Sequence, residues 1–349
     1  MNSTSSNSQT QNAHEIRSTY LQPLPPEQRL INRRQVWAAN RFWMEMDNMK
    51  TKRYGNKRRH HWYELLLMMK SLKWMLRLTG LYKRGLRNAK NITLKEIPLC
   101  FPNLPKEFDK FTILHLSDLH LDGMKGLENR ILRSLSNRTV DLCVFTGDYR
   151  TKLHGLQKQI INGLKYLIDH IDSRQGFIGV LGNHDGCHMV NPMEQIGIHM
   201  LINGTCRIYR ESERILIIGT DDVHYYYTDQ ALHALEHAGK EFSIALVHSP
   251  ELYDMAALMG VDLYLCGHTH GGQVCLPGGK AVIKHLNRGR RYYRGHWHYR
   301  GMQGITNSGV GTSGIPVRFN TQGEILIYQL HRQSVSSYKN CNSSPGQNI

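Results

Sequence analysis

Short apolar runs recur between residues 100 and 332, and longer amphipathic segments separate them. Apolar runs of roughly 4–8 residues that are bounded by turn-forming residues are typical of buried strands. We predict strands at residues 111–116, 142–146, 177–181, 215–219, 244–247 and 263–266. Residues 128–135 and 156–171 have the length and spacing of helices, and they lie between predicted strands. This alternation indicates an α/β domain.

The pattern upstream of residue 100 is different. Residues 1–30 are rich in Ser, Asn, Gln and Pro, and we predict that they lack fixed structure. Residues 31–100 are predicted to form a basic helical N-terminal extension, because apolar and basic residues recur there at helical spacing. A domain over residues 101–332 and a polar tail over 333–349 complete the predicted organisation.

Part of the extension is predicted to be an amphipathic helix. Its basic face carries Lys70, Lys73 and Arg77. The opposite face carries Trp62, Leu65, Met69, Leu72 and Leu76. Such a helix either packs its apolar stripe on the domain or lies in a membrane interface. The basic cluster at residues 50–59 favours the membrane interface.

The formal charge of +16 is concentrated at the N-terminus. Residues 1–110 have a net charge of +13, whereas the remaining residues have only +3. The partner expected from this distribution is an anionic surface, either a membrane or a nucleic acid. Nucleic acid is the weaker of the two, because the charge lies mainly outside the predicted catalytic domain.

Targeting and cysteine signals indicate a cytoplasmic location. The seven cysteines are scattered and form no CxxC pair, which suits a reducing compartment. The first residues have neither the charge nor the apolar core of a secretory signal, and no apolar run is long enough to span a membrane. With the basic extension, this predicts peripheral association with the inner membrane.

Metal-binding residue types follow five of the predicted strands. The motifs are Asp118-Leu119-His120, Gly147-Asp148, Gly182-Asn183-His184-Asp185, His248 and Gly267-His268-Thr269-His270. Carboxylates, imidazoles and one amide suit Mn, Fe or Zn better than Ca or Mg. Two sets of four ligands that share one carboxylate would hold two ions about 3.5–4 Å apart, as in-line displacement at phosphorus requires.

These five motifs, in this order, resemble the calcineurin-like metallophosphoesterase superfamily over about residues 110–330. The segment 307–318, NSGVGTSGIPVR, is similar to a bacterial branch of small phosphodiesterases that are often membrane-associated and that include UDP-2,3-diacylglucosamine pyrophosphatase-type enzymes. The resemblance implies a central β-sandwich flanked by helices. It also implies two divalent ions, with Mn²⁺ expected first and Fe or Zn as alternatives. The implied ligands are Asp118, His120, Asp148 and His270 for one ion, and Asp148, Asn183, His248 and His268 for the other.

The resemblance also implies a mechanism. A hydroxide held between the ions attacks phosphorus, and His184 protonates the leaving oxygen. Many family members place an Asp three residues after the bridging Asp, where it orients the catalytic His. This chain reads Asp148-Tyr149-Arg150-Thr151 and lacks that Asp. We expect Arg150 to contact the substrate phosphate instead.

The predicted function is metal-dependent hydrolysis of a phosphodiester or pyrophosphate bond in a phosphorylated lipid or nucleotide. The best specific substrate is UDP-2,3-diacylglucosamine, cleaved to UMP and the lipid sugar phosphate in lipid A synthesis, because the basic extension suits an amphiphilic substrate. The alternatives are another phospholipid or nucleotide, a nuclease, and a non-catalytic binding module. The complete ligand set argues against the binding module.

Two other segments have competing interpretations. Residues 288–300 mix five arginines with aromatic residues, and could form a substrate-binding loop, a solvated loop or a strip that stacks nucleic-acid bases. Residues 309–314 could cradle a phosphate through backbone N–H groups, but we favour a turn before a final strand, which needs no function.

Overall fold

The computed structural model describes the backbone of residues 26–54, 58–152 and 157–333, and the side chains of 33–48, 67–152 and 157–333. The chain divides into two compact units between Met44 and Glu45. All of the strands described below belong to the second unit.

Helices precede the first strand. They are α2 (Pro26–Tyr54), α3 (Arg58–Leu78) and α4 (Leu81–Lys90). α2 begins at Pro26, inside the segment predicted to be unstructured, and proline suits this position because the first helical residue needs no N–H partner. The rest of that segment, residues 1–25, and the tail residues 334–349 lie outside the described residues. Within the described residues, we find no helix whose length and hydropathy would let it span a bilayer.

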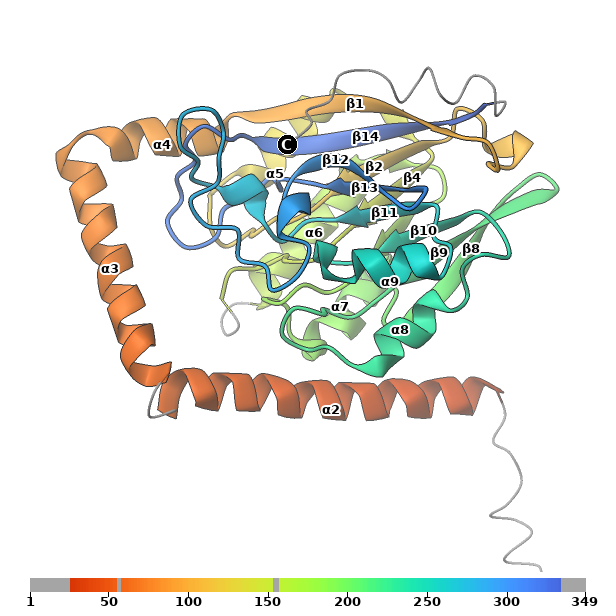
Figure 1. Ribbon diagram of the computed structural model, residues 1–349, viewed down its shortest axis with the longest axis horizontal. Helices are drawn as coiled ribbons and strands as arrows, with labels where there is room; N and C mark the ends of the chain where they lie inside the picture. The colour runs from red at the N-terminus through yellow and green to blue at the C-terminus, as the bar shows by residue number, and fades with distance from the viewer. Residues whose placement is uncertain (1–25, 55–57, 153–156, 334–349) are drawn as a thin grey trace, which may run out of the picture. The chain divides into compact units, whose positions relative to one another are not determined.

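Six strands of the described chain form the first sheet, in the order β1-β14-β2-β4-β6-β7 (Figure 1). Their bounds are β1 (Ile92–Phe101), β14 (Gly323–Arg332), β2 (Thr112–Leu116), β4 (Leu142–Phe145), β6 (Phe177–Gly179) and β7 (Ile198–Met200). The run from β2 to β7 is parallel, β14 is antiparallel to β2, and β1 is parallel to β14.

The second sheet has the order β12-β13-β11-β10-β9-β8 within the described residues. Its strands are β12 (Gly295–Tyr299), β13 (Met302–Thr306), β11 (Leu263–Cys266), β10 (Ser243–Leu246), β9 (Glu213–Gly219) and β8 (Gly204–Arg210). The four central strands are parallel, and both edge strands are antiparallel to their neighbours. A short pair, β3 (Thr139–Val140) and β5 (Asp172–Ser173), lies apart from both sheets.

One buried apolar cluster joins the two sheets. It includes Ile113 and Val144 from the first sheet and Ile217, Leu246 and Leu265 from the second. These residues come from every second position of strands that are buried on both faces, so the opposite faces need cover of their own. The predicted β-sandwich is therefore confirmed.

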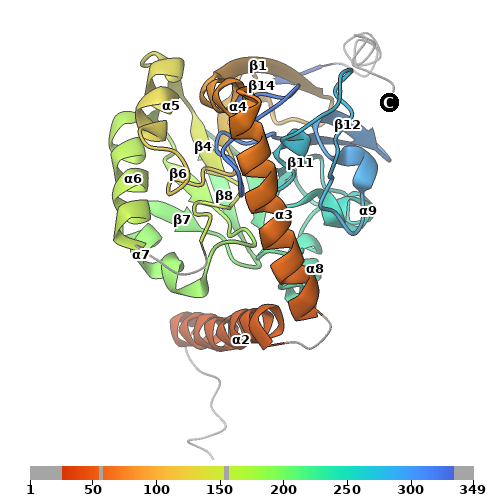
Figure 2. The same ribbon diagram turned by 90° about the vertical axis from the view of Figure 1, so that its left-hand side faces the viewer.

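Helices cover the two outer faces of the sandwich. Figure 2 shows α5 (Leu127–Leu135) and α6 (Gln157–His170) on the side of the first sheet, and α8 (Asp229–Leu235) and α9 (Tyr253–Leu258) on the side of the second. α7 (Val190–Gln195) precedes β7. A second apolar cluster joins α8 and α9 to the second sheet through Ala231, Leu235 and Ala256. The α/β class with flanking helices agrees with the prediction.

A second boundary, besides the start of α2, differs from the sequence prediction. The helical extension was expected to reach residue 100, but β1 occupies residues 92–101 and pairs with β14 over its whole length. β1 contains Pro98 and exposed Lys95 and Glu96, a composition that an edge strand tolerates because only one side of its backbone is paired.

Candidate metal centre and active site

The seven predicted ligands come from both sheets and meet where the parallel strands end. β2 leads into Asp118 and His120, β4 into Asp148, and β6 into the turn with Asn183. From the second sheet, β10 leads into His248 and β11 into His268 and His270. Parallel strands that end at one side of a fold bring the loops after them together, which is why the motifs converge.

One cluster contains Asp118, His120, Asp148 and His270. All four are buried, and one ligand atom from each lies within 4.8 Å of the others. His120 Nε2 is 3.2 Å from His270 Nε2 and 3.7 Å from Asp148 Oδ2, and His270 Nε2 is 3.5 Å from Asp118 Oδ1. This is the predicted first ligand set.

A second cluster contains Asp148, His248 and His268, again with ligand atoms within 4.8 Å of one another. His248 Nε2 is 3.4 Å from Asp148 Oδ2. Asn183 Oδ1 lies 3.0 Å from His248 Nε2 and 2.8 Å from His268 Nδ1. Asp148 belongs to both clusters, so the structure brings together every residue of the two predicted sets. That they bind ions remains a prediction.

Backbone carbonyls orient three of the four histidines. His120 Nδ1 donates to the carbonyl of Arg150 at 3.0 Å, and His248 Nδ1 donates to that of Thr146 at 2.7 Å. These bonds leave Nε2 as the free nitrogen. His268 is reversed, because its Nε2 donates to the carbonyl of His285 at 2.9 Å and Nδ1 faces the cluster. Such bonds fix the tautomer and aim of histidine ligands in metal sites.

Five of the seven candidate ligands have a left-handed backbone. Their φ angles are 50° at Asp118, 42° at His120, 55° at Asp148, 72° at His268 and 51° at His270. This conformation is unfavourable for residues other than glycine, by about 1–3 kcal/mol each, and it concentrates at functional sites. The fold therefore holds these side chains at the cluster against their backbone preference.

Two glycines allow the loops to approach so closely. A Cβ on Gly267 would collide with Ser117 Oγ and with Asp118 Oδ2, and a Cβ on Gly182 would collide with Asp148 Oδ1. Only glycine fits where two ligand loops touch.

The electrostatics of the centre favour bound cations. Burial lowers the pKa of His120 to about 4 and holds the pKa values of His268 and His270 well below the usual range, so these imidazoles are neutral at pH 7. Burial would also lower the pKa of His248, but the Asp148 carboxylate raises it to about 10. Asp148 thus keeps its negative charge and attracts positive charge to the centre of both clusters.

The donor set fits two divalent ions. Asp118 Oδ1 and His270 Nδ1 are buried without a hydrogen-bond partner in the described structure. Two pairs of histidine nitrogens also face each other at 3.2 Å, His120 with His270 and His248 with His268. Buried polar atoms are otherwise paired, and neutral imidazole lone pairs repel unless a cation or proton lies between them. These residues therefore suit a divalent metal site, and both the binding of ions and the nature of the metal remain predictions.

His184 lies beside the first cluster and is half-buried. Its backbone N–H donates to Asp148 Oδ1 at 2.9 Å, and its ring is edge-on to that of His120. Its Nδ1 donates to the carbonyl of Thr151 at 2.7 Å. That carbonyl belongs to the position where many relatives place the orienting Asp, so the chain replaces a carboxylate acceptor with a backbone acceptor. His184 Nε2 is left available for chemistry.

The predicted role of Arg150 finds less support. The residue is buried, its Nε donates to the carbonyl of Lys152, and its Nη1 lies 3.3 Å from His188 Nε2. Its carbonyl orients His120. The guanidinium is thus engaged with protein groups, and a phosphate contact by Arg150 stays a prediction.

Sequence reasoning gave no role to two residues that support the site. Asp185 accepts backbone N–H groups of Asp148, Tyr149 and Gly182 at 2.7, 3.0 and 2.8 Å, and so ties the two loops together. Arg318 is buried and donates to the carbonyls of His270, Ser308, Gly309, Gly311 and Gln322. The position of Asp185, next to a predicted acid, was the available signal. The sequence around Arg318 gives no sign of this role, because the groups that accept its hydrogen bonds are backbone carbonyls.

The two ambiguous segments have structural explanations. Tyr292 and Trp297 are buried in the apolar cluster of the second sheet, so their faces cannot stack bases. In the turn at 309–314, the N–H groups of Val310 and Gly311 donate to the carbonyls of Ser117 and Asp118, so they cannot cradle a phosphate. The segment 273–294 does touch the centre, because the carbonyl of His285 accepts from His268 and that of Tyr293 from Thr269.

A third histidine group lies beside the second cluster. His224 and His285 place a ring nitrogen within 4.8 Å of one on His268. His224 Nδ1 is 3.0 Å from Glu251 Oε2, and this carboxylate also accepts from Ser249 Oγ. Neither histidine follows a predicted strand, so the sequence pattern did not point to them.

Two mixed sheets whose parallel strands end at a buried Asp/His cluster are consistent with a metal-dependent phosphoesterase. The family model described as calcineurin-like phosphoesterase matches residues 111–272. This match supports assignment of the sandwich domain to the calcineurin-like metallophosphoesterase superfamily, and the protein is a phosphoesterase hydrolase.

Similar proteins carry related names. The chain is 26% identical over 266 residues to an uncharacterized metallophosphoesterase, YkoQ, of Bacillus subtilis. The alignment covers 72% of this chain and 94% of that protein. It is 24% identical over 230 residues to the phosphodiesterase YaeI of Escherichia coli, and this alignment covers 63% of this chain and 82% of that protein. A solved structure of the sulfate thiohydrolase SoxB from Thermus thermophilus aligns with a TM-score of 0.41 and 11% identity, covering 69% of this chain and 60% of that one.

Proposed function

We propose that this protein uses two divalent ions to hydrolyse a phosphodiester or pyrophosphate bond of an amphiphilic, lipid-linked substrate at a membrane surface. The observation that carries the hydrolytic part is Asp148, which faces His120 in one cluster and His248 in the other. One carboxylate shared between two ligand sets is the arrangement of two-metal phosphoester hydrolysis. The name of the relative YaeI, a phosphodiesterase, agrees with this reaction class.

Different residues of the chain have different roles in the proposed reaction. When bound, the two ions supply Lewis-acid activation of the phosphoryl oxygens and of the attacking water. Asp118, Asp148, Asn183 and the four clustered histidines would hold them. His184 acts as an imidazolium: its Nδ1–H remains bonded to the carbonyl of Thr151, and its Nε2–H passes to the leaving oxygen.

The membrane part of the proposal rests on α3. Leu67, Met68, Trp74, Met75 and Leu78 are 54–68% exposed. At 100° per residue they share one side of the helix, and the basic residues Lys70, Lys73 and Arg77 lie beside that side. An exposed apolar stripe next to cations suits an anionic lipid surface.

The exposed stripe is not the one expected from sequence. Leu76 is buried, and Met69 is half-buried beside Gly314, where an added Cβ would come within 2.6 Å of Met69 Cε. Leu72 is 38% exposed. The side chains of Trp62 and Leu65 lie outside the described residues. Part of the predicted stripe therefore packs on the domain, and a neighbouring stripe is the one available to lipid.

The segment that contacts His268 also has exposed apolar residues. Leu276, Val282 and Ile283 are 53–62% exposed, and they precede His285 on the same loop. Exposed apolar side chains on a loop that contacts the metal centre support a substrate with acyl chains over a nucleic acid.

A substrate panel tests the proposal. With Mn²⁺ added, we expect hydrolysis of bis(4-nitrophenyl) phosphate that EDTA abolishes and Mn²⁺ restores. Among larger substrates, a diacylated sugar nucleotide such as UDP-2,3-diacylglucosamine should be cleaved faster than a cyclic nucleotide or single-stranded DNA. Preference for DNA would favour a nuclease instead, and no turnover of any compound with any divalent metal would overturn the proposal.

A charge-removal variant tests the membrane contact. The triple variant Lys70→Gln, Lys73→Gln, Arg77→Gln should bind anionic vesicles roughly 100-fold more weakly, because each basic residue at an anionic surface contributes about 1 kcal/mol. Parent binding should also weaken as salt rises, since the side chains are exposed or half-buried. Vesicle co-sedimentation at two salt concentrations measures both effects.

The matched control removes three exposed charges from the region of α5 and α6: Lys125→Gln, Arg133→Gln and Lys158→Gln. It should bind vesicles like the parent. Both triple variants should hydrolyse the soluble aryl ester normally. If the α3 variant binds vesicles as the parent does, α3 serves only to pack on the domain.

A further inference from the structure

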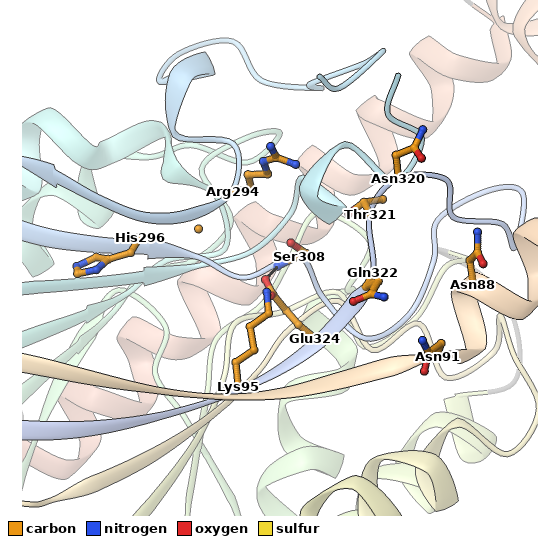
Figure 3. Close-up of a pocket in the computed structure, with 11 residues that line it drawn as sticks. Asn88, Asn91, Lys95, Arg294, His296, Ser308, Asn320, Thr321, Gln322 and Glu324 are labelled. Atoms are coloured by element: carbon orange, nitrogen blue, oxygen red, sulfur yellow. Dashed lines mark hydrogen bonds and ion pairs between the residues drawn. The ribbon is translucent and has the colours of Figure 1, made fainter. Parts of the chain in front are cut away.

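A polar pocket of about 660 Å³ lies between the start of β1, β12 and the loop before β14. Among the described residues that line it, none belongs to the two metal-ligand sets. Figure 3 shows Arg294 and Asn320 above the pocket, Lys95 and Asn91 below it, and Ser308, Gln322 and Glu324 between them. The turn that contains Ser308 also contacts Asp118 through Gly309 and Gly311. The same turn therefore contributes to the pocket and contacts a candidate metal ligand.

Three side-chain amides of the pocket are held in fixed orientations. Asn88 Nδ2 donates to the carbonyl of Arg318 at 3.0 Å, and Asn320 Nδ2 donates to that of Cys275 at 2.8 Å. Each bond leaves a side-chain oxygen to accept from a ligand. Gln322 Oε1 accepts from Thr93 Oγ1 at 2.9 Å, which leaves its Nε2 as a donor. Preoriented donors and acceptors are what a ligand with several hydroxyl groups requires.

One cationic side chain of the pocket, Arg294, is not paired with a carboxylate among the described residues. Lys95 Nζ is 2.6 Å from Glu324 Oε2, and Glu324 Oε1 accepts the backbone N–H of Ser308 at 2.8 Å. The only carboxylate among the lining residues is thus neutralised. Arg294 has no carboxylate partner within the described part of the chain, and its guanidinium lies over the ring of Tyr293, 5.3 Å from the centroid.

More positive charge surrounds the same ring. Lys284 Nζ lies 4.3 Å from the centroid of Tyr293. Burial lowers the pKa of Lys284, and the charges of Arg290, Lys280 and Arg294 lower it further, so these four cations act on one another. Like charges gathered without a carboxylate destabilise a fold unless an anion binds among them. Arg294 extends this cluster into the pocket.

We propose that this pocket binds a small polyhydroxylated anion of the sugar phosphate class. Arg294 takes the phosphate, as the planar donor fork of arginine favours, and the amides of Asn88, Asn320 and Gln322 take the hydroxyl groups. The same chemistry occurs in a free sugar phosphate and in the headgroup of an inositol lipid. The site is separate from the metal centre and does not depend on the proposed reaction.

Isothermal titration of the metal-loaded protein tests the site, with glucose 1-phosphate, glucose and inorganic phosphate as probes. Glucose 1-phosphate should bind tighter than either part alone. Arg294→Gln should weaken its binding by about 10-fold or more, as the loss of a hydrogen bond to a charged group does. Gln322→Ala should weaken it by about 2- to 10-fold, the usual contribution of a neutral hydrogen bond. Arg291→Gln removes an exposed arginine of the same segment from outside the pocket and should have no effect.

Asp148→Asn separates this site from the metal centre. Binding of glucose 1-phosphate should survive in this variant. In the same background, where no hydrolysis occurs, tighter binding of glycerophosphoinositol identifies a lipid headgroup as the ligand, and tighter binding of glucose 1-phosphate identifies a free sugar phosphate. Binding that is lost in Asp148→Asn but unchanged in Arg294→Gln would place the phosphate at the metal centre. That result, or no binding to the parent protein, overturns the proposal.

Discussion

Replacing Asp148 with alanine is expected to abolish turnover and to lower the bound metal toward zero. Asp148 Oδ2 lies 3.7 Å from His120 Nε2 and 3.4 Å from His248 Nε2, so the change removes a ligand from both sets at once. Loss of one charge-stabilising donor typically costs about 10²–10³-fold in kcat. Loss of both ions should exceed that and leave only the background rate. Metal content by mass spectrometry and turnover of an aryl phosphodiester measure the two effects.

Two further variants serve as controls for this experiment. Asp148→Asn keeps the side-chain shape and an acceptor for the N–H of His184, but lacks the charge, and it should lose activity while remaining folded. Asp169→Ala removes an exposed carboxylate whose ion-pair partner among the described residues is Lys165 on the same helix, and it should keep both metal and activity. An Asp148→Ala protein with stoichiometric metal and near-normal turnover would contradict the two-metal arrangement.

His184→Ala should keep its metal but lose roughly 10²–10⁴-fold in kcat, the usual contribution of a general acid. The ring is positioned by Thr151 and is not part of either ligand cluster, so metal content should not change. The loss should be largest for alkyl esters, whose leaving oxygen needs a proton. It should be much smaller for 4-nitrophenyl esters, because nitrophenolate leaves without one.

The control for His184 is His199→Ala, which removes an exposed imidazole from β7 and should not affect either ester. Equal losses on the alkyl and nitrophenyl esters would show that His184 contributes something other than a proton.

The convergence of the candidate ligands could be predicted from sequence because each follows a buried strand, whereas their division into two sets came from the family resemblance. The runs 142–146 and 263–266, for example, became β4 and β11, and their next polar residues entered the clusters. A buried strand has a strong apolar signal, and its end fixes where the following side chains emerge. Two of the strands that the pattern missed have a weak apolar signal: β12 reads GHWHY, and β13 reads MQGIT.

The orientation of His184 could not be predicted in the same way. Its acceptor is the backbone carbonyl of Thr151. Every residue has a backbone carbonyl, so residue types alone could not show that His184 has an acceptor in place of the missing Asp. The prediction of which apolar face of α3 is exposed was wrong for another reason. A helical pattern shows that apolar residues share a side, but two overlapping stripes, one with Leu76 and one with Trp74, were possible, and packing on the domain decided between them.

The pairing of β1 with β14 sets the order in which the protein can be completed during synthesis. β1 leaves the ribosome early, yet the strand it pairs with, residues 323–332, is among the last of the described chain to be made. Until then β2 also lacks its neighbour on one side. Two unpaired strand edges are open to pairing with other chains throughout translation. A nascent chain that stops before residue 323 therefore keeps both edges exposed, even though every candidate metal ligand has already been made.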